Sequence, residues 1–272
     1  MPELPEVETT RRGILPHIEN QTIVKAIIRE RRLRWLIPAN LPQILRNKTI
    51  IKVERRAKYL LLITHEGTII IHLGMSGFLN ILLEHSPIKK HDHIDLVLSN
   101  HKILRFTDPR RFGAFIWTEK TPHEHELLQH LGVEPLSQNF TGRYLHLSAK
   151  NRKAPIKSFL MDNKIVTGIG NIYATEALFA AGIHPTAPAN SISIERLEKL
   201  VKSSKQILRQ AIKHGGTTLK DFVNSDGKPG YFSNQLKVYG RAGKKCFVCQ
   251  SILQSMQIGQ RSTVYCKHCQ QI

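Results

Sequence analysis

Short apolar runs separated by turn residues dominate the first half of the chain. We expect strands at residues 22–29, 59–64, 68–73, 93–98, 103–106 and 114–118. Turn-forming residues such as His65-Glu66-Gly67 separate these runs at intervals of about ten residues, which is typical of a β-sandwich or barrel. A short helix is expected at 6–15. Because no long helix alternates with the strands, the pattern disfavours a doubly wound parallel fold.

The second half of the chain has the residue spacing of helices. Asn171 is a favourable N-cap for a helix over 172–181, which Gly182 ends. A longer helix starts at Ser193 and repeats apolar residues every three or four positions until Gly215-Gly216. The chain therefore combines a β-rich half with a helical half.

These patterns predict an α+β multidomain protein. We expect four segments: a β-rich domain over 1–133, an interdomain linker over 134–150, a helical domain over 151–236 and a cysteine-containing segment over 237–272. The linker is expected where the hydrophobic pattern loosens and turn residues such as Glu134-Pro135 gather.

All four cysteines lie near the end of the sequence, at Cys246, Cys249, Cys266 and Cys269, spaced C-x2-C-x16-C-x2-C. Each C-x2-C pair can direct two thiolates at one point, and two pairs make a closed tetrahedral zinc site. Disulfides are the alternative, but a reducing cytosol disfavours them. The spacing therefore predicts one structural Zn²⁺.

The charge balance indicates a polyanionic partner. The 272 residues include 40 Lys and Arg against 21 Asp and Glu, a formal net charge of +19. Nucleic acid is the favoured partner; a ribosome-bound or membrane-surface protein is the alternative, although no polybasic tail stands out. No apolar run approaches the roughly 18 residues of a membrane span, and no secretory signal is visible. We expect a cytosolic protein.

The first residues could carry chemistry. Removal of Met1 would leave Pro2 as a free secondary amine, and an α-amino group is partly neutral, hence nucleophilic, at physiological pH. Glu3 beside it could act as a general acid or base. Taken alone, the same residues are also compatible with an ordinary approach to a helix.

Three strand and turn positions are further candidates. Lys58 enters the run 59–64, where a lysine is usually a solvated edge residue. Arg110 and Phe112 lie two apart and project to the same side of an extended chain, so together they could enter a DNA base stack. A charged turn with a buried Phe112 explains the same residues equally well.

Three basic or polar positions in the second half suit phosphate contacts. Asn171 follows Gly168-Ile169-Gly170 at an expected helix N-terminus, which favours anions. Arg152 lies within Lys150-Asn151-Arg152-Lys153, three positive charges that could contact the DNA backbone. A solvated surface is the alternative interpretation of this run. Arg261 lies between the cysteine pairs, at the expected tip of a zinc-anchored hairpin; an exposed turn arginine is the plain alternative.

Ordered sequence motifs bring these residues together. They are PELPEVET, RRAKYLLL, IIHLGMSG, KHDHIDL, TDPRRFG, LMDN, GIGNIYA, GGTTLKDF, SDGKPGYF and the terminal cysteine hairpin. The chain resembles, along essentially its whole length, the bacterial formamidopyrimidine-DNA glycosylase (Fpg/MutM) family, base-excision enzymes for 8-oxoguanine and ring-opened purines. The N-terminal octet and the zinc hairpin are the most specific parts of the match.

The resemblance implies an architecture and an activity. The architecture is an N-terminal β-sandwich with flanking helices, a helix-two-turns-helix domain and a C-terminal zinc-finger hairpin, with damaged double-stranded DNA in the cleft between them. The activity is that of a bifunctional DNA glycosylase and AP lyase acting by β,δ-elimination. The resemblance also implies a monomer, and we expect it in the bacterial cytosol or nucleoid. No small-molecule cofactor motif appears beyond the zinc ligands.

The resemblance also assigns catalytic roles to residues. It implies Pro2 as the Schiff-base nucleophile, Glu3 as the acid of base excision and Lys58 as a proton donor in β-elimination. Arg261 matches the zinc-finger arginine that holds the flanking phosphates and is assigned to δ-elimination.

A further set of residues is expected to contact DNA. Met75, Arg110 and Phe112 resemble the residues that fill the gap left by the flipped nucleotide. The family's other DNA-contact positions fall on His91, Arg152 and Asn171, as well as Arg110. Lys220 lies in the stretch that resembles the loop closing over the damaged base.

Two rival interpretations remain open. Endonuclease VIII-like glycosylases share the proline amine and usually the zinc hairpin but favour oxidised pyrimidines; the PELPEVET start and the long polar stretch 217–232 favour the purine enzyme. A non-catalytic, zinc-containing nucleic-acid-binding protein fits the charge and the cysteines, but it has no need of Pro2, Glu3 and Lys58.

Overall fold

The structure is a computed structural model that describes residues 1–217 and 232–272. The chain divides into two compact units, one of 1–129 with 214–231 and one of 130–213 with 232–272. Among the described residues, no helix combines the length and apolarity that crossing a membrane requires.

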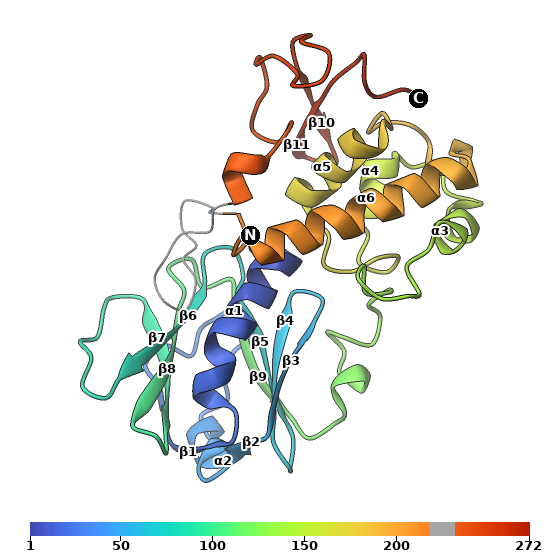
Figure 1. Ribbon diagram of the computed structural model, residues 1–272. Helices are drawn as coiled ribbons and strands as arrows, with labels where there is room; N and C mark the ends of the chain where they lie inside the picture. The colour runs from blue at the N-terminus through green and yellow to red at the C-terminus, as the bar shows by residue number, and fades with distance from the viewer. Residues whose placement is uncertain (218–231) are drawn as a thin grey trace. The chain divides into compact units, whose positions relative to one another are not determined.

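Unit 1 is a sandwich of two antiparallel sheets (Figure 1). One sheet has the order β2-β1-β7-β8-β6 and the other the order β3-β4-β5-β9. The strands are β1 (Gln21–Ile28), β2 (Thr49–Ile50), β3 (Lys52–Arg56), β4 (Tyr59–Ile63), β5 (Thr68–His72), β6 (Phe78–Leu83), β7 (Asp92–Leu98), β8 (Lys102–Thr107) and β9 (Ala114–Thr118). The expected β-rich domain is thus a sandwich rather than a barrel.

The core of unit 1 lies between the sheets and is closed by α1 (Leu4–Ile18), which contacts strands of both sheets. A short helix, α2 (Leu41–Leu45), adds two more buried leucines. Ile14 and Ile18 of α1 pack into the same apolar cluster as Leu60 and Phe106. Each such side chain, once fully buried, stabilises the fold by about 1.5–3 kcal/mol. This packing holds the start of α1, and with it the N-terminus, in a defined place.

The expected strands are present in unit 1, and the sequence pattern missed three more. β2 has only two residues, and β3 reads KVERR with a single buried position, Val53. β6 reads FLNILL but leaves most of its residues partly exposed. Such strands lack the apolar alternation by which strands are predicted, so only their pairing partners reveal them.

Unit 2 contains four helices and a hairpin in its described residues (Figure 1). The elements are α3 (Gly142–Ala149), α4 (Ile156–Leu160), α5 (Asn171–Ala181), α6 (Ile194–Lys213), β10 (Gln254–Ile258) and β11 (Arg261–Tyr265), with short 3-10 turns at Pro122–Glu124 in unit 1 and at Ala189–Ser191 and Phe232–Gln235 in unit 2. α5 packs on α6 and on β11, and α6 also packs on α3. The helical half and the cysteine hairpin therefore form one unit.

Helix α3 lies within residues 134–150, which we expected to be a linker. The Thr141 hydroxyl caps the helix by accepting a hydrogen bond from Tyr144 N at 3.0 Å, and Leu145 and Ala149 are buried. A Cβ on Gly142 would lie 2.8 Å from the backbone nitrogen of Glu198, so glycine permits the close approach of α3 to α6. The segment belongs to unit 2, and its glycine and short length hid the helix from the sequence pattern.

Helix α5 also differs from the expectation. Gly170 is its N-cap residue, and Asn171 is the first residue of the helix rather than the cap. The Asn171 side chain makes contacts with other elements instead, as described below. Gly182, with φ of +71°, ends the helix as expected.

Candidate functional site

The first residues of the chain are buried at the start of helix α1. Pro2 is buried, Glu3 is 3% exposed and Glu6 is fully buried. In a capping box, Glu6 Oε2 accepts a hydrogen bond from Glu3 N at 2.9 Å. Glu6 Oε1 accepts another from Thr217 N at 2.8 Å. The Glu6 carboxylate therefore joins the first residues of the chain to a segment more than 200 positions away.

The α-amino group lies among several charged side chains. Burial lowers the pKa of the Met1 amine below its ordinary value; Glu3 and Glu6 act in the opposite direction, and Lys58 and Arg110 lower the pKa further. A depressed pKa increases the neutral, nucleophilic share of an amine at neutral pH. The structure thus brings Lys58 and Arg110, predicted from separate motifs, to the N-terminus.

Lys58 is held by a tight turn between β3 and β4. Arg56 pairs with Tyr59, which leaves Ala57 and Lys58 as the turn, and Ala57 has φ of +56°. Lys58 is only 7% exposed, so it is not the solvated edge lysine of the plain alternative. Burial, followed by the charges of Lys58 and Arg34, lowers the pKa of His72 on β5 to about 4. His72 is therefore neutral at pH 7, and its Nδ1 accepts a hydrogen bond from Gly74 N at 3.0 Å.

Two loops of unit 1 present large side chains to solvent. Met75 is 41% exposed and Phe112 is 44% exposed, so the alternative of a buried Phe112 does not hold. The Arg110 guanidinium lies 5.0 Å from the centre of the Phe112 ring, in a cation–π contact. A cleft of about 460 Å³ is lined by Met1, Arg34, His72, Gly74, Met75, Arg111 and Phe112. The exposed apolar side chains and the amino terminus therefore line one cleft.

A second cluster, in unit 2, is organised by a buried lysine. Lys157 on α4 is 1% exposed. Its Nζ donates to Asn171 Oδ1 at 2.5 Å and to Thr263 Oγ1 at 2.6 Å, and Asn171 Nδ2 donates to the Ser262 carbonyl at 3.1 Å. These bonds hold the start of β11 against the start of α5, and they fix the backbone that follows Arg261.

The hairpin that carries Arg261 has a tight two-residue turn. Gly259 and Gln260 both have positive φ, at +54° and +59°, and Ile258 pairs with Arg261 across them. Positive φ at both central residues is the geometry of a type I′ turn, which suits the twist of a hairpin. Arg261 is exposed at the first position of β11.

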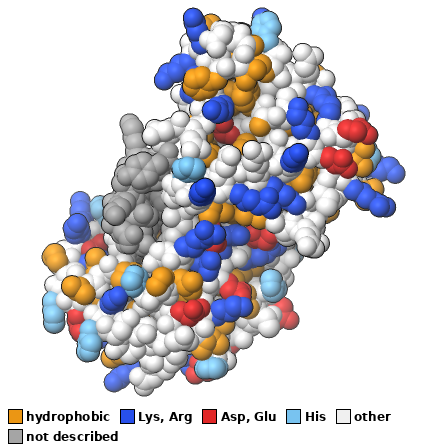
Figure 2. Space-filling view, in the orientation of Figure 1, with side chains coloured by type: hydrophobic (Ala, Val, Ile, Leu, Met, Phe, Trp, Pro, Cys, Tyr) orange, Lys and Arg blue, Asp and Glu red, His pale blue; other side chains and the backbone are white. Residues whose placement is uncertain are grey.

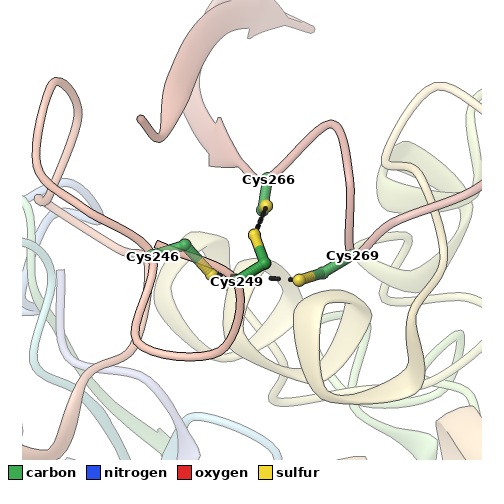
Figure 3. Close-up of side chains that lie close together, drawn as sticks. All are labelled: Cys246, Cys249, Cys266 and Cys269. Carbon is green, nitrogen blue, oxygen red and sulfur yellow. Dashed lines mark hydrogen bonds between the residues drawn. The ribbon is translucent and has the colours of Figure 1, made fainter. Parts of the chain in front are cut away.

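The four cysteines converge at the base of this hairpin (Figure 3). Their sulfur atoms all lie within 4.8 Å of one another, with 3.9 Å between Cys246 and Cys269 and 3.4 Å between Cys249 and Cys266. Tetrahedral zinc with Zn–S bonds of about 2.3 Å requires sulfurs about 3.8 Å apart. Hydrogen bonds from the side chain and backbone of Ser251 lower the pKa of Cys249 to about 6, which favours the thiolate that binds metal. The residues fit one structural zinc ion.

The remaining expected contact residues lie on the surface of their units. His91 is partly exposed just before β7, and Arg152 is exposed between α3 and α4. Figure 2 shows Lys and Arg side chains spread over the face in view rather than gathered at one end. Lys220 lies outside the described residues. Unit 1 thus holds Pro2, Glu3, Lys58, Met75, His91, Arg110 and Phe112, and unit 2 holds Arg152, Asn171, Arg261 and the cysteines.

Known proteins place this arrangement in a family. Family models match the formamidopyrimidine-DNA glycosylase N-terminal domain at residues 1–115, the H2TH domain of that enzyme at 131–223 and a zinc finger found in FPG and IleRS at 243–272. A curated formamidopyrimidine-DNA glycosylase from Shewanella oneidensis is 57% identical over 270 residues, 99% of this chain and 99% of the relative. The chain belongs to the formamidopyrimidine-DNA glycosylase family.

Solved structures of the family have the same fold. The MutM (Fpg) protein from Thermus thermophilus superposes with a TM-score of 0.86 at 35% identity, over 99% of this chain and 98% of that one. Lactococcus lactis Fpg in complex with DNA containing N7-benzyl-Fapy-dG has a TM-score of 0.91 at 32% identity, over 100% of both chains. Other L. lactis complexes contain abasic-site DNA or DNA with an oxidised pyrimidine.

Sequence reasoning missed several residues that build the sites of this family member. Glu6 was not singled out, because Glu3 is not one of the usual N-cap residues and only the structure shows the capping box that the two form. Lys157 was not singled out either, because a lysine on a short helix normally reaches solvent. His72 gave no signal of its own, since only the folded sheet places it near Lys58.

Proposed function

We propose that this protein is a DNA glycosylase and AP lyase that excises oxidised purines, including 8-oxoguanine and formamidopyrimidines, from duplex DNA. A full-length relative is named formamidopyrimidine-DNA glycosylase, and a structural neighbour is bound to DNA that contains N7-benzyl-Fapy-dG. The observation that carries the proposal is the buried Pro2-Glu3 N-terminus next to Lys58 and an exposed Met75, Arg110 and Phe112. A binding protein has no need of an amine enclosed in this way.

The chemistry begins once Met1 is removed and Pro2 becomes a secondary amine. Pro2 is buried, and Lys58 and Arg110 lie close enough to act on the charge of the amino terminus beside it. The Pro2 nitrogen then attacks C1′ of the damaged nucleotide as the bond from C1′ to the base breaks, and Glu3 supplies the proton that the departing base takes up. The Pro2 nitrogen next loses its own proton, the C1′–O4′ bond of the sugar ring breaks, and O4′ takes up that proton. These changes leave an iminium between Pro2 and C1′.

Strand cleavage follows from the iminium. The iminium withdraws electrons, so a C2′ proton is lost and the C3′–oxygen bond breaks in β-elimination, with Lys58 as a proton donor. Arg261 holds the flanking phosphates for the second, δ-elimination. A zinc ion held by the four cysteine thiolates would stabilise the hairpin. Lys157 and the type I′ turn set the position of Arg261 on that hairpin.

DNA binding and base extrusion use the remaining residues. The formal net charge of +19 supplies salt-dependent, sequence-independent affinity, with His91, Arg152 and Asn171 as phosphate contacts. Extruding a base costs a few kcal/mol of unstacking, which Met75, Arg110 and Phe112 offset by occupying the gap. Lys220 is proposed as a further DNA-contact residue on the resemblance alone. We further propose that the protein acts as a monomer in the bacterial cytoplasm.

Strand cleavage of defined duplexes tests the substrate class. Met1-processed protein should cleave a duplex with one 8-oxoguanine opposite cytosine, and it should cleave the matched undamaged duplex at no measurable rate. Preferential cleavage of a thymine-glycol duplex would instead assign the protein to the endonuclease VIII-like class. Tight binding without cleavage of any of these duplexes would leave a non-catalytic DNA-binding protein.

A further inference from the structure

One buried carboxylate connects the two loops that carry Met75, Arg110 and Phe112. Asp108 is fully buried. Its Oδ1 accepts hydrogen bonds from Ser76 Oγ at 2.9 Å and from Arg110 N at 3.3 Å, and its Oδ2 accepts one from Gly113 N at 2.8 Å. Ser76 is the residue after Met75, while Arg110 and Gly113 flank Phe112. Each oxygen of the Asp108 side chain therefore accepts a hydrogen bond from a backbone N–H close to Phe112. Oδ1 also binds the side chain of Ser76, the neighbour of Met75.

The two loops also touch directly. Arg110 N donates a second hydrogen bond to Ser76 Oγ at 3.2 Å. Gly74 has φ of +64°, and a Cβ placed on it would lie 2.5 Å from the carbonyl carbon of Phe112. The backbone of the Met75 loop is therefore in contact with the backbone of the Phe112 loop, which only a glycine permits.

Asp108 is itself fixed to the sheet. Its backbone nitrogen donates to the His91 carbonyl at 3.1 Å, and its carbonyl oxygen lies 2.8 Å from His93 Nε2. β7, which contains His93, pairs with β8, the strand that ends just before Asp108. Asp108 is thus held by the sheet through its backbone, and its carboxylate in turn holds two loops whose side chains face solvent.

We propose that Asp108 is a positioning residue that holds Met75, Arg110 and Phe112 as one preorganised wedge for entry into the DNA base stack. The inference rests on the proposed function and extends it to a residue that does not contact DNA. Asp108 acts through the Ser76 hydroxyl and through the backbone of Arg110 and Gly113, and it takes no part in the chemistry at C1′.

The chemistry of the side chain explains why a carboxylate is needed. All three groups that face it, Ser76 Oγ–H, Arg110 N–H and Gly113 N–H, act as donors, and an ionised carboxylate accepts through both oxygens. An asparagine of the same shape has one oxygen and one NH₂ group. Whichever way the amide is turned, its NH₂ group faces a backbone N–H of the loop 110–113, that of Gly113 in one orientation and that of Arg110 in the other. Only the Ser76 hydroxyl can rotate and accept instead of donating.

Asp108→Asn and Ser76→Ala test the proposal on two duplexes, one with 8-oxoguanine opposite cytosine and one with a preformed abasic site. Excision requires a stacked base to be displaced, whereas an abasic site has no base to unstack. A misplaced wedge should lower kcat/KM for 8-oxoguanine excision on the order of 10²-fold in Asp108→Asn. The rate of abasic-site cleavage should stay within about 3-fold of wild type if extrusion alone is impaired.

Asp95→Asn is the matched control. Asp95 is a carboxylate in the same sandwich, 1% exposed, and it bonds to Arg29 and Arg105 rather than to the wedge loops. It should lower stability and change the two activities in equal proportion. A 2-aminopurine placed beside the lesion reports wedge entry as a fluorescence rise, which should be lost in Asp108→Asn and kept in Asp95→Asn.

Three results would overturn the positioning role: unchanged excision in Asp108→Asn, an equal fall of both activities in Asp108→Asn and Ser76→Ala, or an unchanged 2-aminopurine signal. If Asp108→Asn does not fold, Ser76→Ala, which removes one donor to the carboxylate, decides through the same ratio. If wild-type protein cleaves neither duplex, the proposed function fails, and the 2-aminopurine signal still reports on the wedge.

Discussion

Gly74 offers a sharp test of the contact between the two wedge loops. Its φ of +64° is unfavourable for alanine, and a Cβ would lie 2.5 Å from Phe112 C and 2.6 Å from Gly113 N. Gly240, with φ of +72°, has nothing within 4 Å of the position that a Cβ would occupy. The two glycines share the backbone conformation and differ only in what surrounds them.

The expected free energies follow from that difference. The left-handed conformation costs an alanine about 1–2 kcal/mol, and the loss of unfolded-state freedom returns about 0.4–1 kcal/mol. Gly240→Ala should therefore destabilise its unit by about 0.5–1 kcal/mol. Gly74→Ala also forces backbone atoms apart, which adds about 1–3 kcal/mol. We expect a total of about 2–4 kcal/mol, or a fall in Tm of about 5–15 °C.

Thermal unfolding of each variant, followed with wild type in the same buffer, measures the two losses. Gly74→Ala should also lower 8-oxoguanine excision more than abasic-site cleavage, because the loops that separate carry Met75 and Phe112. Equal stability losses in Gly74→Ala and Gly240→Ala would refute the close contact between the loops. Only the hydrogen bonds of Asp108 and Ser76 would then join the two loops.

Three further predictions concern charge, metal and pH. Lys157→Met should lower δ-elimination more than base excision in a gel that separates the two cleaved ends, because Thr263 and Asn171 lose the donor that holds them at 2.6 and 2.5 Å; equal losses would show that Lys157 does not position Arg261. Removal of zinc with a chelator should abolish strand cleavage and release the hairpin, since a structural zinc contributes about 10–16 kcal/mol, and metal analysis should find one zinc per chain before treatment; cleavage that survives complete removal would contradict this. His72 has a folded pKa of about 4 against an ordinary 6.5, so the unfolded chain binds more protons between these values and unit 1 loses up to about 3 kcal/mol as pH falls from 6.5 to 4. The free energy of unfolding, measured with denaturant, should therefore differ less between pH 7 and pH 5 in His72→Gln than in wild type. A difference as large as that of wild type would count against a neutral His72.

Much of the fold was predictable because local patterns and long-range packing agree. The runs 59–64 and 68–73 are strands in the sequence pattern, and β4 and β5 are central strands with buried residues in the structure. The four cysteines were predicted as one site from spacing alone, because a C-x2-C turn brings its own two thiols together. Where the pattern was weak, as in the partly exposed β3 and β6, only pairing with neighbouring strands defines the element.

The candidate site was predictable only in part, because its geometry arises from contacts between distant residues. Asn171 looked like an N-cap, but Gly170 takes that place and the Asn171 amide bonds to Lys157 and Ser262. Such contacts span 14 and 91 positions of sequence, and no local pattern encodes them. Asp108 belonged to a noted motif, yet its link to Ser76 appears only when β6 and β8 are paired, with Phe78 opposite Thr107.

The proposed reaction depends on a Schiff base between Pro2 and C1′, and borohydride trapping detects that bond most directly. Met1-processed protein would be incubated with a duplex carrying 8-oxoguanine opposite cytosine, reduced, and separated on a denaturing gel. A covalent protein–DNA band that is absent with Pro2→Gly and with undamaged duplex is the predicted result. A band of equal strength with Pro2→Gly, or no band on any damaged duplex despite tight binding, would contradict the assignment of Pro2 as the nucleophile.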